Sequence, residues 1–294
     1  MTTAPEPVTG ERRHLVNLAY RLLGSLAEAE DAVQEAYARW YALSRPQREA
    51  ISSPGAWLTT VASRICLDLL GSARIRRERY VGEWIPEPVP DHAEGAHGDP
   101  ADRITLDESV SMAFLVALEA MTPAQRVALV LHDVFRYSFA EVAEITGRTP
   151  AACRELASAA RRRIRTARPS ATPAAHQAGL VRTFKQAWQA ADIDTLIGLL
   201  DPDATFTADG GGLVQAALEP INGAEAIARY LTDLAVRGGG SMTLVERAVN
   251  GSPGLVIRRG EETSAVYAFD AAGGRVTHIW AVRNPQKLRL WTGG

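Results

Sequence analysis

The stretch YSFAEVAEITGRTPAACRELASAARRRIR, residues 137–165, predicts two short helices joined by a tight turn. Ser138 and Glu141 have the spacing of a capping box, which satisfies the free amide donors at the start of a helix. Gly147 stands where a helix ends in a left-handed residue, and Thr149, followed by a proline, is typical of the start of the next helix. The stretch therefore predicts a helix-turn-helix.

The second helix of this pair has an apolar face and a polar face. The apolar face is expected to consist of Cys153, Leu156, Ala157, Ala160 and Ile164. The other face begins with small residues and carries arginines along its length, which suits a helix that lies in the major groove of DNA. The residues expected to contact DNA here are Arg148, Thr149, Ala151, Arg154, Glu155, Ser158, Arg161 and Arg162.

A purely structural interpretation has to be weighed against DNA binding. Two amphipathic helices with a glycine turn also occur in other all-α proteins, where the charged face is merely solvated. Local charge favours DNA, because residues 148–168 hold seven arginines and one acid, a balance of +6 in a chain whose net charge is −2. Such a reversal of charge is suited to binding phosphate.

The whole chain has 294 residues, enough for two or three domains with cores of their own. No apolar run reaches the length of a membrane span, and Arg12 and Arg13 are not followed by the apolar region of a signal peptide. The two cysteines, Cys66 and Cys153, fall on helices of different predicted domains, so we expect two buried thiols and no metal site or disulfide. The expected location is the cytoplasm.

A first helical domain is predicted over residues 10–80. It contains a helix that ends at Gly24, a helix from Ser25 to about Tyr41, a loop over residues 43–53, and a third helix that starts at Ser53. The third helix is expected to turn Thr60, Ser63, Arg64 and Asp68 outward, and it runs into a stretch with five arginines against two acids over residues 64–79.

An acidic linker is predicted over residues 81–108. Residues 83–108 hold eight acids and one arginine, a balance of −7, and the prolines around Trp84 exclude a helix there. Such composition is typical of a solvated linker, although a large aromatic residue usually covers a surface.

A second helical domain, residues 109–168, contains the helix-turn-helix, and an α+β domain is predicted over residues 174–294. In the latter, helices are followed by a run of strands with turn glycines, a pattern that favours a curved antiparallel sheet packed on helices. The predicted fold is thus two all-α domains followed by an α+β domain.

Three sequence segments resemble sigma factors of the extracytoplasmic-function (ECF) group. They are AEDAVQEAYARW at 29–40, SPGAWLTTVASRICLDLL at 53–70 and TPAQRVALVLHDVFRYSFAEVAEITGRTPAACRELASAARRR at 122–163. These segments are similar to sigma regions 2 and 4, in the order and spacing of the family. The C-terminal third resembles the SnoaL-like cone fold, and WIPEP (84–88), DGGG (209–212) and NPQKL (284–288) are similar to three motifs of sigma factors with that extension. One departure is Leu213, where the family often has a basic residue.

The resemblance implies partners and site residues. Asp31, Gln34, Glu35 and Arg39 match the segment that binds the β′ clamp helices of core RNA polymerase, whose β flap is a further expected partner. Residues 43–53 and the start of the next helix match the part that captures bases of the melted minus-ten strand. Basic residues expected beside it are Arg64, Arg74, Arg76 and Arg77. Trp57 fits either a stack on such bases or the helical core, and its helical spacing favours the core. The helix at 150–165 matches the reader of the minus-thirty-five element.

The three motifs of the extension also predict a regulatory contact within the chain. We expect the C-terminal domain to dock against the linker and the helices, in an arrangement that prevents the two DNA-reading domains from spanning a promoter. The residues expected to form this contact are Trp84, Pro86, Glu87, Pro88, Asp209, Gly210, Gly211, Gly212, Asn284, Pro285, Lys287 and Leu288. An unidentified small ligand in the cone is a further expected partner; no cofactor, metal or membrane is expected.

Two alternatives remain open from the sequence. The cone fold also occurs in small-molecule enzymes, for which Asp209, Tyr267, His278 and Trp280 are the candidate residues here. A one-component regulator, with a helix-turn-helix and a ligand-sensing domain, is the other alternative. The first helical domain argues against it, because a repressor needs neither a polymerase-binding helix nor a basic melting helix.

Overall fold

The computed structural model describes residues 9–78, 80–90, 110–167, 174–238 and 242–291. The chain divides into two compact units. One contains Met1–Glu78, His97–Thr105 and Ala117–Ala167, and the other contains Arg79–Ala96, Leu106–Val116 and Arg168–Gly294. Each unit is described by itself.

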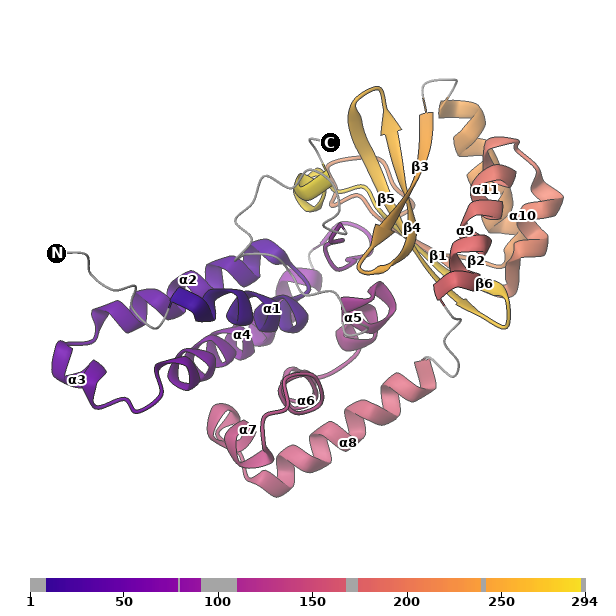
Figure 1. The fold of residues 1–294 in the computed structure, drawn as a ribbon. Coiled ribbons are helices and arrows are strands. Elements are labelled where there is room, and N and C mark those ends of the chain that lie inside the picture. Colours follow the sequence, from indigo (N-terminus) through magenta and orange to yellow (C-terminus); the bar gives the residue numbers. More distant parts are fainter. Residues whose placement is uncertain (1–8, 79, 91–109, 168–173, 239–241, 292–294) are drawn as a thin grey trace. The chain divides into compact units, whose positions relative to one another are not determined.

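The first unit is helical (Figure 1). Its first part consists of a short 3-10 turn η1 (Thr9–Glu11) and helices α1 (Arg12–Leu23), α2 (Leu26–Ala42), α3 (Arg45–Glu49) and α4 (Pro54–Glu78). Helix α5 (Met112–Glu119) begins in the second unit and ends in the first. The second part of the first unit continues with α6 (Pro123–Leu129), the π-helix η4 (Val130–Val134), α7 (Phe139–Thr146) and α8 (Pro150–Ala167).

The helices of the first part pack as their apolar spacing predicts. Helix α1 ends at Gly24, whose φ of 69° is left-handed, and Ser25 accepts from the amide of Glu28 to start α2. The buried residues of α2 recur at helical spacing: Leu26, Ala29, Ala32, Val33, Ala36 and Trp40. Tyr37, on the same side of the helix, is only partly buried.

Two details of this part differ from the prediction. The stretch 43–53 is not all loop, because α3 forms within it, where the side chain of Gln47 accepts from the amide of Ser44. Ser63, expected to point outward from α4, is fully buried. The side chain of Ser63 is small enough to fit a tightly packed helix interface. Its polarity therefore gave the wrong prediction that it points outward.

The predicted helix-turn-helix is confirmed. Ser138 and Glu141 bond each other's amides at the start of α7, Gly147 has a φ of 65°, and the side chain of Thr149 accepts from the amide of Ala152 at the start of α8. The π-helical turn η4, which precedes α7, was not predicted. Such turns are short and lack a local sequence pattern.

The second unit contains a six-stranded sheet with helices on one face (Figure 1). The helices are α9 (Ala174–Gln189), α10 (Ile193–Leu199) and α11 (Ala224–Gly238). The strands are β1 (Leu200–Asp209), β2 (Ile221–Asn222), β3 (Met242–Val249), β4 (Ser252–Arg259), β5 (Glu262–Ala272) and β6 (Arg275–Val282), in the order β2-β1-β6-β5-β4-β3. Two 3-10 turns, η6 (Pro285–Lys287) and η7 (Arg289–Trp291), follow β6.

The α+β architecture is as predicted, but the sheet is mixed. Strands β1 and β6 pair in parallel, whereas the other neighbours are antiparallel. The long connection from β1 through α11 to the hairpins provides the crossover that a parallel pair needs.

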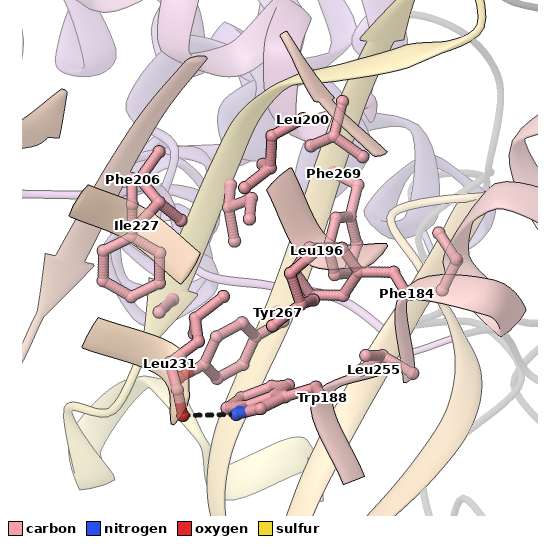
Figure 2. Close-up of a cluster of buried hydrophobic side chains, with 14 of the residues drawn as sticks. Phe184, Trp188, Leu196, Leu200, Phe206, Ile227, Leu231, Leu255, Tyr267 and Phe269 are labelled. Carbon is pink, nitrogen blue, oxygen red and sulfur yellow. Dashed lines mark hydrogen bonds between the residues drawn. The ribbon is translucent and has the colours of Figure 1, made fainter. Parts of the chain in front are cut away.

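The two faces of this sheet bury two different clusters. Between the sheet and the helices lies an aromatic core in which Trp188 packs on Tyr267 and donates its indole N–H to the carbonyl of Leu231 at 2.6 Å (Figure 2). On the other face a second cluster includes Trp280 and Trp291 of the sheet domain together with Ile85 of the linker and Met112 of α5. Residues 81–90, the described part of the linker, contain no helix, as predicted for the segment around Trp84. None of the helices within the described ranges is long and apolar enough to cross a bilayer.

Candidate functional site

The outer face of α8 is exposed, as the helical spacing predicts. Cys153, Ala157 and Ala160 are fully buried on the inner side, while Leu156 and Ile164 are partly buried. The exposed residues of the predicted DNA-contacting set are Arg148, Thr149, Ala151, Arg154, Glu155, Ser158 and Arg162. Most of the set surrounds a hollow of about 840 Å³, lined by Arg148, Arg154, Glu155, Ser158, Arg161 and Arg162 among others. This positive face could receive phosphates.

Two arginines of α8 are held by residues of η4 and α7. The guanidinium carbon of Arg154 lies 5.2 Å from the centre of the Phe139 ring. Arg161 donates from Nε and Nη2 to the two carboxylate oxygens of Asp133, each at 2.6 Å. This paired hydrogen bond raises the pKa of Arg161 above its ordinary value, so Arg161 keeps its charge.

The charged face predicted on α2 is also exposed. Asp31, Gln34, Glu35 and Arg39 all face away from the buried side of the helix. Glu35 and Arg39 form an ion pair at 2.8 Å, with about half of each side chain exposed. The face therefore combines acidic, amide and basic groups without any role in core packing.

The first basic residue predicted to lie near the melted strand makes an unexpected contact. Arg64 of α4 donates to the carbonyls of Glu144 and Ile145, at 2.7 and 3.3 Å, at the C-terminal end of α7. The carbonyls in the last turn of a helix have no partner within the helix and favour a cation. The side chains of Arg74, Arg76 and Arg77 lie outside the described part of the structure. Trp57 is partly buried and packs on Trp40 at 5.3 Å, so it belongs at least partly to the core.

A second arginine makes the reciprocal contact. Arg126 of α6 is 2% exposed and donates to the carbonyl of Leu22, at 2.9 Å, near the C-terminal end of α1. It also bonds the carbonyl of Leu118 twice and pairs with Glu119 at 2.7 Å. Each of the two helical parts thus supplies one arginine to the end of a helix in the other; together Arg64 and Arg126 are called the arginine exchange below.

A histidine lies at the same junction. His14 of α1 is 3.2 Å from the hydroxyl of Tyr137, which donates to Thr59 of α4 at 3.3 Å, and the His14 ring meets Phe135 edge-on at 5.2 Å. Burial, together with the nearby charge of Arg21, holds the pKa of His14 below its ordinary value, against the opposite influence of Glu11. The neutral imidazole is therefore favoured where these helices pack.

In the second unit, the carboxylate of Asp209 binds the linker. This side chain is fully buried and accepts four hydrogen bonds: from the Tyr80 hydroxyl at 2.6 Å, the Gly211 amide at 3.0 Å, the Ile85 amide at 3.0 Å and the Lys287 ammonium at 2.7 Å. One of the four donors, the Ile85 amide, belongs to the linker, and Tyr80 directly precedes the linker. Burial, and then the hydrogen bond to Asp209, raise the pKa of Tyr80, so its hydroxyl stays a donor.

Lys287 connects the C-terminal motif to the linker motif. Its ammonium also donates to the carbonyl of Ile85 and lies 4.1 Å from the centre of the Trp84 ring. Nearby, Asn284 donates to the Tyr80 hydroxyl at 2.8 Å. The three motifs recognised in the sequence therefore meet around one buried ion pair, which we call the linker clamp: Tyr80, Trp84, Ile85, Asp209, Asn284 and Lys287.

The linker is held at a second place, by Asn250 in the turn after β3. The backbone amide of Asn250 donates to the carbonyl of Val89 at 2.8 Å, and its side-chain oxygen accepts from the amide of Val89 at 3.1 Å. Its side-chain nitrogen donates to the carbonyl of Val110 at 2.8 Å. Trp291 donates its indole N–H to the carbonyl of Pro88 at 2.9 Å. Pro86, Glu87, Pro88 and Leu288 are all buried here, and Pro285 is exposed.

The glycine loop at 209–212 allows a close approach of other chain segments. Gly211 has a φ of 63°, and a Cβ there would lie 2.3 Å from the side-chain nitrogen of Asn284. At Gly210 a Cβ would lie 2.4 Å from the carbonyl oxygen of Val214. Leu213, which stands where the family often has a basic residue, is 57% exposed. The cation of the linker clamp is thus Lys287.

The candidate catalytic residues do not come together. Asp209 is saturated by the linker clamp, and His278 lies four residues before Val282, the neighbour of Asp209 in the β1–β6 pair. At about 3.3 Å per residue this places His278 about 13 Å along the sheet from Asp209. Tyr267 lies in the aromatic core, whereas Trp280, on which His278 stacks, belongs to the cluster on the other face.

Several functional residues were missed by the sequence analysis. They bond partners far away in sequence: Arg126–Leu22 spans 104 positions, His14–Tyr137 spans 123, Asn250–Val110 spans 140 and Trp291–Pro88 spans 203. Local spacing contains no information on such pairs. The one available signal in the sequence was Arg126, an arginine among the apolar residues of its helix, which indicates a buried charge that needs a partner.

A helix-turn-helix with an arginine-lined reading helix, in one unit with a second helical domain, defines a DNA-binding protein of transcription. Residues 8–78 match the family model of sigma-70 region 2, and residues 111–164 match that of sigma-70 region 4. Among curated proteins, the ECF RNA polymerase sigma factor SigJ of Mycobacterium tuberculosis is 40% identical over 94% of this chain and 90% of its own length. The probable ECF sigma factor SigI of the same species is 34% identical over 94% of the chain and 92% of its own length.

A solved structure agrees with these comparisons. The crystal structure of M. tuberculosis SigJ matches with a TM-score of 0.77 and 37% identity, over 96% of this chain and 97% of that one. The chain belongs to the ECF RNA polymerase sigma factors, and the match to SigJ extends through its C-terminal α+β domain.

Proposed function

We propose that this sigma factor binds core RNA polymerase through α2, reads promoter DNA through α4 and α8, and is restrained by its own C-terminal domain. The observation that carries the proposal is that one chain presents two separate exposed faces, a mixed-charge face on α2 and an arginine-lined face on α8. A plain repressor needs only the second. The proposal includes four segments: region 2 at 10–80, the acidic linker at 81–108, region 4 at 109–168 and the C-terminal domain at 174–294.

The polymerase contact is proposed for Asp31, Gln34, Glu35 and Arg39. These side chains lie opposite the buried face of α2, so a partner can bind them without unfolding the helix. Charged pairs at a protein interface mainly give specificity and a fast, salt-sensitive association. The β′ clamp helices and the β flap are the proposed partner surfaces.

The promoter contacts are proposed for two places in the first unit. The exposed face of α8 would enter the major groove at the minus-thirty-five element. The segment around α3, the start of α4 and the basic residues of α4 would take the melted minus-ten strand, because single-stranded bases need a basic track and stacking surfaces. Arg64 belongs to that track.

The restraint is proposed to have two parts. In the arginine exchange, Arg64 bonds α7 and is therefore withheld from nucleic acid, while Arg126 ties region 4 to region 2. The linker clamp holds the segment between the two regions on the C-terminal domain. Polymerase has to compete with contacts inside one chain, which have a high effective concentration.

A small ligand in the C-terminal domain has no support from the described residues. Aromatic and aliphatic side chains, among them Phe184, Trp188, Phe206 and Tyr267, fill the space between the sheet and its helices (Figure 2). A signal that acts on the linker clamp itself is the simpler proposal, because only differential binding to the open and closed states can shift their balance. The cytoplasm, where core polymerase transcribes, stays the proposed location.

Run-off transcription with core polymerase tests the proposal. The full chain is compared with Lys287→Met, which breaks the linker clamp, and with Lys185→Met as a matched control. Lys185 is the only other lysine of the chain and pairs with Glu246 on the outside of the C-terminal domain. We expect more core binding and more transcript for Lys287→Met alone. Absence of any core-dependent transcript would contradict the function; equal transcript from all three would contradict only the restraint.

A further inference from the structure

Three arginines lie along one flank of α8. Arg154, Arg161 and Arg165 are seven and four residues apart, so at about 3.6 residues per turn they share a side of the helix. The neighbouring strip consists of Ala151, Glu155, Ser158 and Arg162. The arginine flank is the one that contacts η4 and α7, since Arg154 and Arg161 bond residues there.

The partner of Arg154 is itself firmly placed. Phe139 is the first residue of α7, directly after the capping residue Ser138. The ring of His132 stacks on Phe139 with centroids 3.8 Å apart and planes 22° from parallel. His132 is fixed in turn by a contact of 2.8 Å between its Nδ1 and the carbonyl of Tyr137. Phe139 thus connects Arg154 to the π-helical turn.

Arg161 has an equivalent support one residue further along that turn. Asp133 accepts from two of its five N–H groups, which fixes the plane of the guanidinium and leaves three donors for another acceptor. Both supports act on long side chains that would otherwise lose much rotamer freedom on binding. An arginine oriented in advance is suited to a fixed target such as a phosphate oxygen.

We propose that Phe139 is a positioning residue, which holds Arg154 ready to contact a phosphate at one wall of the major groove, as Asp133 does for Arg161. The inference rests on the proposed function of α8 as the promoter-reading helix. It divides the exposed face of α8 into a flank that binds phosphate and a strip, with Arg162, that faces the bases. Phosphate contacts fix register without reading sequence.

The test uses holoenzyme formed from the full chain and core polymerase. The probes are a duplex selected by that holoenzyme from a random pool and an unrelated duplex of equal length. Arg154→Ala should weaken binding to both duplexes by the same factor and reduce the slope of log K against log salt by about one. Phe139→Leu should weaken both by about two- to five-fold, the range of an exposed cation–π contact, and Phe139→Trp should restore binding.

A double-mutant cycle separates positioning from general packing. Phe139→Leu with Arg154→Ala should bind no more weakly than Arg154→Ala alone, because the same contact is lost. Phe139→Leu with Arg165→Ala, on the same flank, should be additive. If the first pair is additive, or if Phe139→Trp does not restore binding, the positioning role is overturned.

Different results would contradict the positioning role of Phe139 and the proposed function of α8. Arg162→Ala should weaken the selected duplex more than the unrelated one. If Arg162→Ala loses affinity in this way while Arg154→Ala keeps its affinity and salt slope, the phosphate flank is wrong and the reading helix stands. If neither variant changes binding, α8 does not lie in the groove. Should Phe139→Leu melt at a lower temperature than the parent, Phe139→Trp and the Arg154 variants still decide the question.

Discussion

Lys287 and Asp209 form an ion pair that is almost completely buried, with 10% and 0% of their side chains exposed. Such a pair need not add stability over an apolar pair of the same shape, because both charges lose their hydration. Removing one member is different, since the other charge is then left buried without its partner. The pair therefore makes the contact between linker and C-terminal domain sensitive to single changes.

The first prediction concerns this pair. Lys287→Met should lower the stability of the second unit by about 3–5 kcal/mol and release the linker, because Asp209 would remain buried without its counter-ion. Hydrogen exchange checks it directly, since the amide of Ile85 bonds Asp209 and should lose protection. Lys185→Met, in a partly exposed ion pair at 3.1 Å, should leave the exchange of residues 80–90 unchanged. Full protection of Ile85 in Lys287→Met would contradict the role of the pair.

At this scale the sequence predicted residue types better than residue contacts. The motifs around Trp84, Asp209 and Lys287 pointed to a shared contact, and the structure brings these residues together. Arg64 was expected beside single-stranded DNA, and in this structure it bonds the end of α7. An arginine suits either acceptor, so its chemistry alone could not tell phosphate from helix carbonyls; the DNA contact stays a prediction.

At the scale of single elements, α2 has a buried apolar face and an exposed charged face, for which binding to core polymerase is proposed. Charge reversal at Asp31 and Glu35 should weaken binding to core polymerase several-fold, while the free energy of unfolding changes by less than about 0.5 kcal/mol per residue. Titration of labelled sigma factor with core polymerase measures the affinity. Glu225→Lys is the control, because Glu225 forms the same kind of exposed ion pair with Arg229, one turn away on α11. Unchanged core affinity would remove α2 from the interface.

Helix α1 carries a titratable group into the junction with region 4. The folded-state pKa of His14 is lowered, mainly by burial, from an ordinary value of about 6.5. The unfolded chain therefore binds more protons below that pH, and the stability of the first unit should fall as the pH drops through 6.5 towards the folded-state pKa. Thermal melts from pH 7.5 to 5 check the direction. His14→Gln should flatten this part of the curve; an identical curve would assign the effect to other groups.

The elements that were predicted well begin and end with local signals. Ser138, Gly147 and Thr149 determine the ends of α7 and α8 through bonds within a few residues, so the sequence was sufficient. Helix α3 was hidden in a stretch that reads as a loop, and the π-helix η4 has no local pattern at all. Asp133 and His132 belong to η4, so their contacts with Arg161 of α8 and with Phe139 could not be predicted from the sequence.

For the molecule as a whole, the arginine exchange joins regions 2 and 4, which are proposed to bind separate promoter elements. Arg64→Ala should loosen this contact, because each charge-assisted bond contributes about 1.5–3 kcal/mol. Spin labels on Gln34→Cys and Ser158→Cys, both exposed sites, would report the distance between regions 2 and 4. The native Cys66 and Cys153 are buried, and burial raises the pKa of Cys66, so neither should react with the label.

The expected result for Arg64→Ala is a broader distribution with longer distances. Arg148→Ala is the control, since Arg148 is exposed on region 4 itself. The same narrow distribution in both variants would mean that Arg126 alone holds the regions together. The sequence could not predict this arrangement, because it depends on pairs such as Arg126 and Leu22, 104 positions apart.

Asn250 binds both Val89 and Val110, and so it brings two points of the chain that are 21 residues apart to the two sides of one amide group. A segment of that contour length, once free at one end, can bridge at most about 70–75 Å. While Val89 and Val110 are both bonded to Asn250, the distance between the two ends of the segment is limited to about the width of one side chain. We therefore expect that releasing one end of this segment increases the distance between the two stretches of double helix that the protein can bind at the same time.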